Sequence, residues 1–326
     1  MTSRFWIVTA VLLLAAAPGC DRPKPQSAPG GLAGDLVLFH AGSLAVPLRE
    51  VSALFQKENP GVTVKAEAAG SRDSARKISD LGRPCDVLAS ADYQVVNELL
   101  IPKHADYNIR FASNEMAIAY TAKSKLADTI DADHWPEILA RPEVAVGRAE
   151  PDRDPCGYRT VMLLQLAEKH YALPGLAERL LAKDGRLVRP KETDLLALLE
   201  SGEIDYLFIY RSVIQQHGLK MIALPKEVNL GSPELDATYR TVSATIAGGQ
   251  PGTTATQRGE AIVYSVTIPR DPPNRAAAEA YVALLLSPRG QEILRANGQT
   301  PIRPALADSL EKLPPSLRPL CAEAKK

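Results

Sequence analysis

Residues 35–69 read DLVLFHAGSLAVPLREVSALFQKENPGVTVKAEAA, and this stretch decides the fold. The apolar run Asp35–Phe39 predicts a short strand. In Ala45–Glu58 the apolar residues recur on one helical face, and Pro47 is acceptable in the first turn of a helix. The alternating segment Gly61–Ala69 predicts a second strand. A strand, a helix and a strand in this order predict a βαβ unit with parallel strands.

The same alternation continues along the chain. Further strands are predicted over Asp86–Ser90, Arg110–Thr121, Val144–Gly147, Arg186–Val188, Ile204–Tyr210, Tyr239–Ile246 and Ala261–Ile268. Further helices are predicted over Asp73–Leu81, Tyr93–Leu100, Pro155–Tyr171, Thr193–Ser201, Asn274–Leu286 and Pro288–Asn297. We therefore predict an α/β fold of two lobes, each a mostly parallel sheet flanked by helices.

The expected crossings between the lobes are the strands near residues 115 and 262. Lobe one then holds residues 35–114 and 262–326, and lobe two holds residues 115–261. Three prolines lie in the C-terminal tail, residues 305–326, which we expect to form a short helix followed by loose surface chain.

The first 19 residues predict a lipoprotein signal peptide. Arg4 precedes the apolar run Phe5–Ala17, which is short for a membrane span and typical of a signal sequence. Cys20 follows small residues, so we expect it to be lipidated, and Asp21 after it indicates retention at the periplasmic face of the inner membrane. Residues 20–34 have the proline and glycine content of a flexible linker. An ordinary signal peptide with an unmodified Cys20 is the alternative.

Composition excludes several classes of protein. Hydrophobic residues make up 45% of the 326 residues and charged residues 23%, which excludes a polytopic membrane protein. Lys+Arg and Asp+Glu are both 38, so no basic surplus supports nucleic-acid binding, and an anion site must come from local geometry. The five histidines form no metal motif. The pairing of Cys85, Cys156 and Cys321 is not readable from the sequence.

Three segments place small or hydroxyl residues where a strand ends and a helix begins: Phe39–Ser43, Ala68–Ser71 and Asp152–Arg159. Helix N-termini offer unpaired N–H groups and a positive dipole end to an anion. In open α/β sheets the ligand crevice lies at these carboxyl ends of the strands. Each of Ser43, Ser71 and Asp154 is also explained as a plain N-cap. Because the same strand-to-helix junction occurs three times, the sequence favours an anion-binding cleft.

Several runs together resemble one family. They are FHAGSLAVPLREV, EAAGSRDSARKISDLGRPCDVLASADY, DPCGYR, RPKETDLLALLESGEIDYLFIYRSV and QQHGLK…LP. The chain resembles the tungstate/molybdate-binding family of periplasmic binding proteins from Asp35 to about Pro304. The resemblance implies a type II periplasmic binding fold that captures molybdate or tungstate between its lobes. It implies delivery to the permease of an ABC importer, without catalysis or a cofactor. We expect a monomer that meets the membrane only through its lipid.

The resemblance also implies which residues hold the oxyanion. Two of them, Asp154 and Glu192, match carboxylate ligands of the metal centre, and Cys156 is expected to contribute its backbone N–H. The full set is Gly42, Ser43, Ser71, Asp154, Pro155, Cys156, Glu192 and Tyr210.

Two carboxylates beside a dianion need an explanation, because like charges repel strongly in a desolvated cleft. One carboxyl could be protonated and donate a hydrogen bond. Alternatively, each carboxylate could bind the metal, raising its coordination from four to six, as the resemblance implies. That arrangement would favour molybdate and tungstate over sulfate, which cannot readily expand its shell.

Other functions stay open on the residues alone. One is a receptor for a tetrahedral oxyanion such as sulfate. Another is an exported serine hydrolase using Ser71 or Ser74, because Ser74–Lys77 matches an S-x-x-K pattern, although its partner motifs are missing. Tyr206 and Tyr210 could suggest a ferric-ion site, but Tyr206 is better explained as a core residue.

Overall fold

The computed structural model describes residues 31–183, 185–250 and 252–324 of the chain. The predicted signal peptide, Cys20 and most of the predicted linker lie outside the described residues. Cys85, Cys156 and Cys321 are all free thiols. Within the described ranges, no helix combines the length and the apolar character that a bilayer crossing requires.

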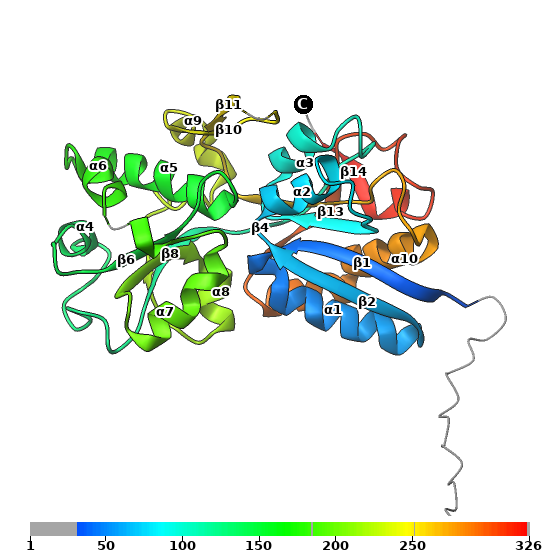
Figure 1. Ribbon diagram of the computed structural model, residues 1–326, viewed down its shortest axis with the longest axis horizontal. Helices are drawn as coiled ribbons and strands as arrows, with labels where there is room; N and C mark the ends of the chain where they lie inside the picture. Colours follow the sequence, from blue (N-terminus) through cyan, green and yellow to red (C-terminus); the bar gives the residue numbers. More distant parts are fainter. Residues whose placement is uncertain (1–30, 184, 251, 325–326) are drawn as a thin grey trace, which may run out of the picture.

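The first lobe is built on a seven-stranded sheet in the order β14-β13-β4-β12-β3-β1-β2 (Figure 1). Its strands are β1 (Ala33–Ala41), β2 (Gly61–Ala69), β3 (Val87–Ser90), β4 (Ile109–Ser113), β12 (Val263–Thr267), β13 (Thr300–Ala307) and β14 (Cys321–Glu323). Its helices are α1 (Ala45–Glu58), α2 (Ser71–Ser79), α3 (Tyr93–Leu99), α10 (Arg275–Leu286) and α11 (Pro288–Ala296).

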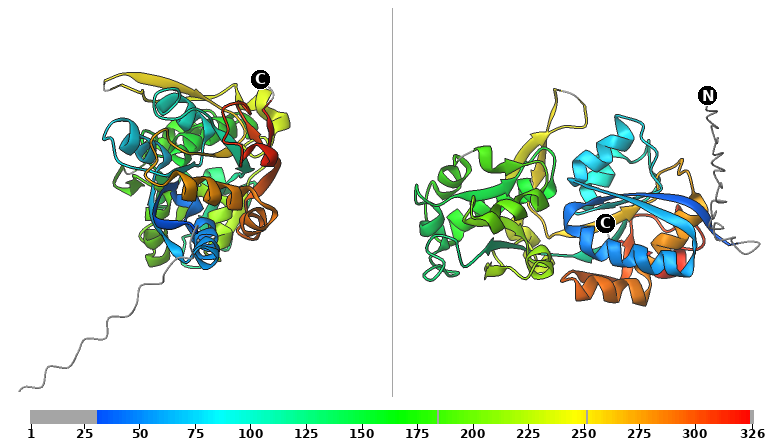
Figure 2. Two further views of the ribbon diagram at one scale, coloured as in Figure 1. Left: turned by 90° about the vertical axis from the view of Figure 1, so that its right-hand side faces the viewer. Right: turned by 60° about the horizontal axis from the view of Figure 1, so that its bottom comes forward.

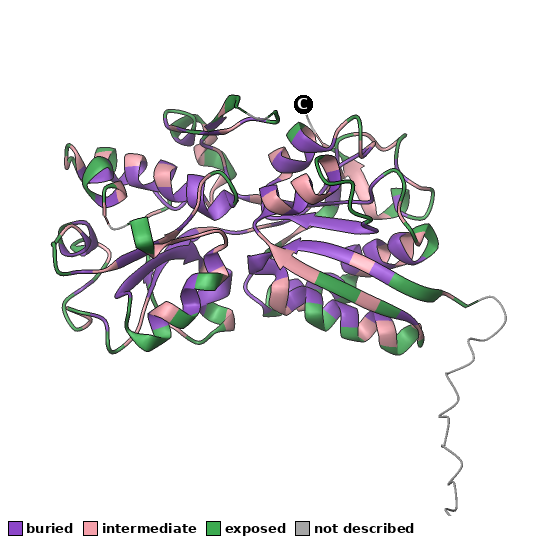
Figure 3. Cartoon of the chain, in the orientation of Figure 1, coloured by how far each residue is buried: buried purple, intermediate pink, exposed green. Residues whose placement is uncertain are grey.

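Alternation along β1 fixes the two faces of this sheet. Leu36 and Leu38 pack in one buried cluster with Val51 of α1. Phe39 packs in a second cluster with Ala75 of α2, on the other face. Both clusters are buried, so helices cover the sheet on both sides. Figure 3 shows the buried residues in purple on the strands and on the helices that flank them.

The second lobe is built on a five-stranded sheet in the order β7-β6-β8-β5-β9. Its strands are β5 (Met116–Tyr120), β6 (Val146–Ala149), β7 (Val188–Arg189), β8 (Tyr206–Tyr210) and β9 (Lys220–Ala223). Its helices are α4 (Trp135–Leu139), α5 (Pro155–His170), α6 (Leu176–Leu181), α7 (Leu196–Ser201), α8 (Arg211–Gln216) and α9 (Asp236–Tyr239). A separate two-stranded hairpin, β10 (Ser243–Ala247) and β11 (Thr254–Arg258), follows α9.

The two-lobed α/β fold is therefore confirmed (Figures 1 and 2). The chain leaves the first sheet after Ser113, enters the second at Met116 and returns at Val263. The two connections lie side by side, because the Asn114 N–H donates to the carbonyl of Ile262 at 3.3 Å. The Asn114 side-chain amide also donates to the Tyr264 hydroxyl of β12 at 2.8 Å.

The expectation of mostly parallel sheets is wrong. The first sheet has three parallel and three antiparallel pairings, and the second has two of each. The crossings explain part of the difference: β12 comes back from the second lobe and runs antiparallel to β3 and β4. Alternating helices and strands in the sequence do not reveal this direction.

Three segments also differ from the prediction. The single strand expected over Arg110–Thr121 is two strands, β4 and β5, which belong to different sheets. The strand expected over Tyr239–Ile246 begins only at Ser243, because Asp236–Tyr239 is the helix α9. The tail is not loose surface chain: β13 extends to Ala307 and Cys321–Glu323 pairs with it as β14. The three tail prolines lie between these two strands, so they interrupt no strand pairing.

Candidate functional site

Asp154 and Glu192 meet at the start of two helical segments. Asp154 is the N-cap of α5, and its Oδ1 accepts the N–H of Cys156 at 2.9 Å. Its Oδ2 accepts the backbone N–H of Glu192 at 3.1 Å. Glu192 opens the 3₁₀ turn Glu192–Leu195 that leads into α7. Asp154 therefore caps one helix and anchors the start of another, which joins the two predicted carboxylates in one site.

The Glu192 carboxyl is buried and accepts no hydrogen bond from an N–H or O–H group of the described residues. Its residue is 1% exposed, and both of its oxygens lack a partner among the described residues. Such a group is expensive to bury unless something else binds it. Gly42 lies against it, because a Cβ built on Gly42 would stand 2.9 Å from both carboxyl oxygens. Glu192, from the second lobe, therefore faces the first-lobe turn Gly42–Leu44.

Burial shifts the protonation of this pair. Burial first, and the neighbouring Asp154 charge second, raise the pKa of the Glu192 carboxyl well above its usual range. Burial also raises the pKa of Asp154, although the Glu192 carboxyl first, and then the two N–H groups that Asp154 accepts, act in the opposite direction. The protonated form of Glu192 is therefore favoured when nothing binds its oxygens.

The two predicted serines come from the first lobe. Ser43 follows Gly42, and its Oγ accepts a hydrogen bond from the Tyr264 hydroxyl at 3.0 Å. Ser71 begins α2, and its Oγ accepts the N–H of Ala91 at 2.9 Å. Both serines are completely buried. Because each oxygen is acting as an acceptor, each hydroxyl proton remains available for donation to an anion.

Tyr210 ends β8 beside a buried arginine. Its hydroxyl accepts from Nη1 of Arg159 at 3.1 Å, and its ring lies edge-on to Tyr264 with centroids 5.9 Å apart. The same Nη1 donates to the carbonyl of Ala91 at 2.8 Å. Ala91 therefore bonds to Ser71 through its N–H and to Arg159 through its carbonyl. This path connects the serine of one lobe to the tyrosine of the other.

The structure thus brings the predicted residues together from both lobes. Pro155 occupies the first turn of α5, as predicted for a residue after an N-cap. The N–H of Cys156, expected to face the oxyanion, donates here to Asp154, while the Cys156 thiol donates to the carbonyl of Phe208 at 3.7 Å. Sequence reasoning missed Arg159, although it lies inside the DPCGYR run, and it missed Tyr264.

A surface cavity of about 400 Å³ opens between the lobes beside this cluster. Gly70, just before Ser71, and Arg153, just before Asp154, both line it. Lys191, which precedes Glu192, lines it as well. The mouth of the interlobe cleft is therefore bordered by the chain neighbours of three candidate site residues.

The alternative chemistries receive little support from these contacts. Tyr206 is buried and donates to the Lys125 carbonyl at 2.5 Å, as a core tyrosine does. Across the described ranges, no hydrogen bond joins the hydroxyl of Ser71 or Ser74 to a histidine, a lysine or a carboxylate. The same ranges contain no group of three or more His, Cys, Asp or Glu residues placed to hold a metal ion.

Known proteins are similar to this chain over most of its length. Residues 36–300 match the family described as bacterial extracellular solute-binding protein. An uncharacterized solute-binding protein of Petrotoga mobilis is 45% identical over 288 residues, which are 88% of this chain and 90% of that protein. The molybdate/tungstate-binding protein WtpA of Pyrococcus abyssi is 42% identical over 299 residues, 83% of this chain and 86% of that protein.

Solved structures share the fold at low identity. The periplasmic molybdate-binding protein of Azotobacter vinelandii superposes with a TM-score of 0.59 at 19% identity, over 81% of this chain and 98% of that one. The sulfate-binding protein SubI of Mycobacterium tuberculosis superposes with a TM-score of 0.61 at 14% identity, over 82% of this chain and 87% of that one. These likenesses establish the two-lobed binding-protein architecture alone. The family match and the two relatives of over 40% identity show that the chain belongs to the bacterial extracellular solute-binding protein family.

Proposed function

We propose that the protein captures molybdate or tungstate between its lobes and delivers the oxyanion to an ABC importer. The observation that carries this proposal is the Glu192 carboxyl, which is buried against Gly42 with both oxygens unpartnered. The relatives named for molybdate and tungstate binding, at 40% and 42% identity, point to the same ligands.

The site residues divide into two roles. Ser43 and Ser71 donate their hydroxyl protons to ligand oxygens from the first lobe. Asp154 and Glu192 each bind the metal of the oxyanion, raising its coordination from four to six. Tyr210 lines the site, and Pro155 and Cys156 set the turn that holds Asp154. Gly42 leaves room for Glu192 beside the ligand.

Selectivity follows from the carboxylates. Two ionised carboxylates repel any dianion, and in a buried site the repulsion is several kcal/mol by the Coulomb relation. Molybdenum and tungsten regain this energy through the added metal–oxygen bonds. Sulfur in sulfate does not form such bonds readily, so sulfate would experience the repulsion without the compensation.

Capture requires the lobes to move relative to one another. The paired connections at Asn114 and Ile262 form the hinge in this proposal, with lobe one as residues 35–114 and 262–326 and lobe two as residues 115–261. A ligand that contacts both lobes favours the closed state, which the permease would bind. The protein acts as a monomer, held by lipid on Cys20 at the periplasmic face of the inner membrane, after removal of the signal peptide.

The test is calorimetric titration of the protein with tungstate, molybdate and sulfate in turn. Saturable binding of tungstate and molybdate at one site, with no heat from sulfate, is the expected result. X-ray absorption at the tungsten edge would then report six oxygen neighbours. Equal affinity for sulfate would refute this proposal and indicate a receptor for tetrahedral oxyanions in general.

A further inference from the structure

The β10–β11 hairpin spans the two lobes on the side of α2 and α3 (Figures 1 and 2). Its base belongs to the second lobe, where the N–H of Ser243 donates to the Gln165 side chain of α5 at 3.2 Å, and the Ser243 carbonyl accepts from the same side chain at 3.0 Å. Its other end contacts the first lobe. The hairpin therefore bridges the cleft on its outer side.

Arg72 of α2 holds this far end. Its side chain is fully buried. Nη2 donates to the carbonyl of Ala247 in β10 at 2.5 Å, and Nε donates to the carbonyl of Asp152 at 3.3 Å. Nη1 pairs with Glu98 of α3 at 3.2 Å. Two of its three partners thus belong to the second lobe.

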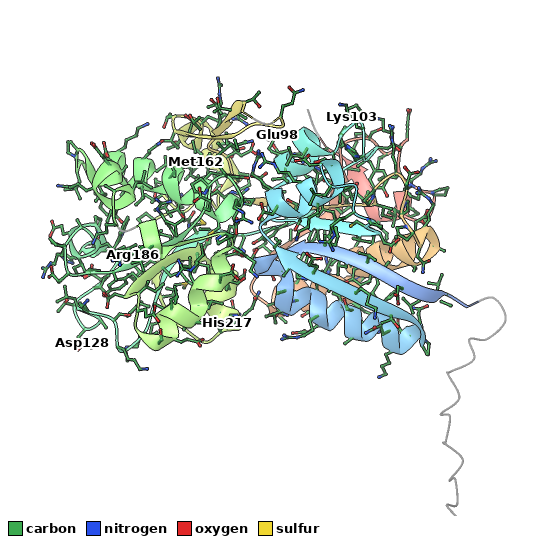
Figure 4. The ribbon with its side chains drawn as sticks, viewed as in Figure 1. Glu98, Lys103, Asp128, Met162, Arg186 and His217 are labelled. Atoms are coloured by element: carbon green, nitrogen blue, oxygen red, sulfur yellow. The ribbon has the colours of Figure 1, made fainter. Side chains whose placement is uncertain are left out.

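The remaining contacts strengthen the same junction. Glu98 also accepts a hydrogen bond from Gln257 of β11, and Figure 4 labels Glu98 at the edge of the first lobe beside the hairpin. Arg76, one turn after Arg72 on α2, donates to the carbonyl of Gly248 at 2.7 Å. Oδ1 of Asp152 accepts the N–H of Ala247 at 2.6 Å.

The position of this junction in the chain connects it to the binding site. Arg72 directly follows Ser71, and Asp152 lies two residues before Asp154. A guanidinium without partners is costly to bury. The burial of Arg72 is tolerated here because both lobes supply hydrogen-bond acceptors to it. Separation of the lobes removes the acceptors at Ala247 and Asp152 together. Opening of the cleft would therefore break the bonds of Arg72 to the second lobe.

We propose that β10 and β11 form a strap that Arg72 fastens across the closed cleft, and that this strap sets how long the captured oxyanion stays bound. Arg72 is a positioning residue and touches no ligand atom. The strap rests on the proposed function, because residence time has meaning only for a protein that binds the oxyanion. It adds a kinetic element that is separate from the residues around the metal.

The test measures tungstate release by stopped flow from the full-length protein and from two variants. Arg72→Gln removes the guanidinium. Gln257→Ala removes the hydrogen bond from β11 to Glu98 and serves as the second variant if Arg72→Gln fails to fold. We expect release about tenfold faster in each variant, since a hydrogen bond to a charged group is lost or weakened. The association rate and the six-neighbour absorption spectrum should stay as in the wild type.

Arg83→Gln is the matched control, because Arg83 also comes from the first lobe but pairs there with Glu67 at 2.7 Å. It should release tungstate at the wild-type rate. Hydrogen exchange provides a second readout: the hairpin peptide should gain protection when tungstate is added. Wild-type release rates in a folded Gln257→Ala or Arg72→Gln variant, or unchanged hairpin exchange, would overturn the strap. A wild-type protein that binds no tungstate would instead refute the proposed function.

Discussion

Arg159 of α5 and Asp92, the N-cap of α3, form an ion pair of 2.8 Å that joins the two lobes behind the candidate site. Both side chains are almost completely buried. Asp92 also accepts from the Tyr158 hydroxyl at 2.6 Å. The pair is thus held on both sides, and the arginine reaches Tyr210 from the same position. The closure proposed above would therefore bury a matched pair of charges.

Replacing Arg159 with Met should weaken tungstate binding by about two to three orders of magnitude. Removing one partner of a buried pair costs about 3–5 kcal/mol, because the other charge stays buried and unpaired. The cost falls on the closed state, since opening returns Asp92 to water. Calorimetry would measure the loss, with Arg179→Met as control, because Arg179 is an exposed arginine of the same lobe. A further Asp92→Asn change should recover part of the affinity, and a double variant no better than the single one would contradict this account.

Changing Glu192 to Gln should reduce tungstate affinity by about a hundredfold or more, because even an outer partner of a metal site is worth 10- to 100-fold. Any sulfate affinity should fall less, or rise, because the amide removes a negative charge. Asp154→Asn should shift selectivity in the same direction. Competition titrations measure both ions, with exposed Glu203→Gln as control. Equal weakening for both anions would rule out bonding to the metal.

The affinity for tungstate should rise with pH. The pKa of Glu192 is raised, by burial first and by Asp154 second, so the free carboxyl holds a proton at pH values where an ordinary glutamate has lost it. A metal ligand must be ionised, so binding releases this proton. Affinity then increases with pH up to the raised pKa and is constant above it. Titrations from roughly pH 6 to pH 9, in buffers of different ionisation enthalpy, measure the release. Proton uptake, or falling affinity, would indicate a protonated carboxyl that donates to the oxyanion.

Gly70→Ala should prevent full closure without unfolding either lobe. A Cβ at position 70 would stand 2.3 Å from the carbonyl oxygen of Arg153, across the cleft. The lobes would have to separate slightly, at a cost of about 1–3 kcal/mol. We expect tungstate affinity to fall about tenfold, with little change in the melting temperature of the ligand-free protein. Gly185→Ala is the control, because a Cβ there meets nothing within 4 Å. Wild-type affinity in Gly70→Ala would show that this approach does not limit closure.

Much of the candidate site was predictable from local patterns. Asp before Pro is a strong helix start, and α5 begins at Pro155, as the sequence indicates. The apolar face of Ala45–Glu58 predicts α1 with its observed bounds. These features depend on neighbours in the chain, which a single sequence displays directly.

The buried arginines were not predictable in the same way, because their partners come from distant segments. Arg72 does carry a weak signal. It lies in the first turn of α2, where the helix dipole disfavours a cation. A buried arginine at this position therefore needs an acceptor from another segment of the chain. The hairpin was missed for a related reason: Thr254–Arg258 is a polar strand, and its residues are mostly exposed.

The direction of β1 has a mechanical consequence. The strand starts at exposed Ala33 and ends at buried Ala41, beside Gly42 and the candidate site. Nine residues of extended chain cover roughly 30 Å. The described part of the chain therefore begins at the outer end of the first lobe, away from the cleft. A membrane anchor attached there would hold the first lobe in place. The second lobe would then be the one that moves when the ligand is bound or released.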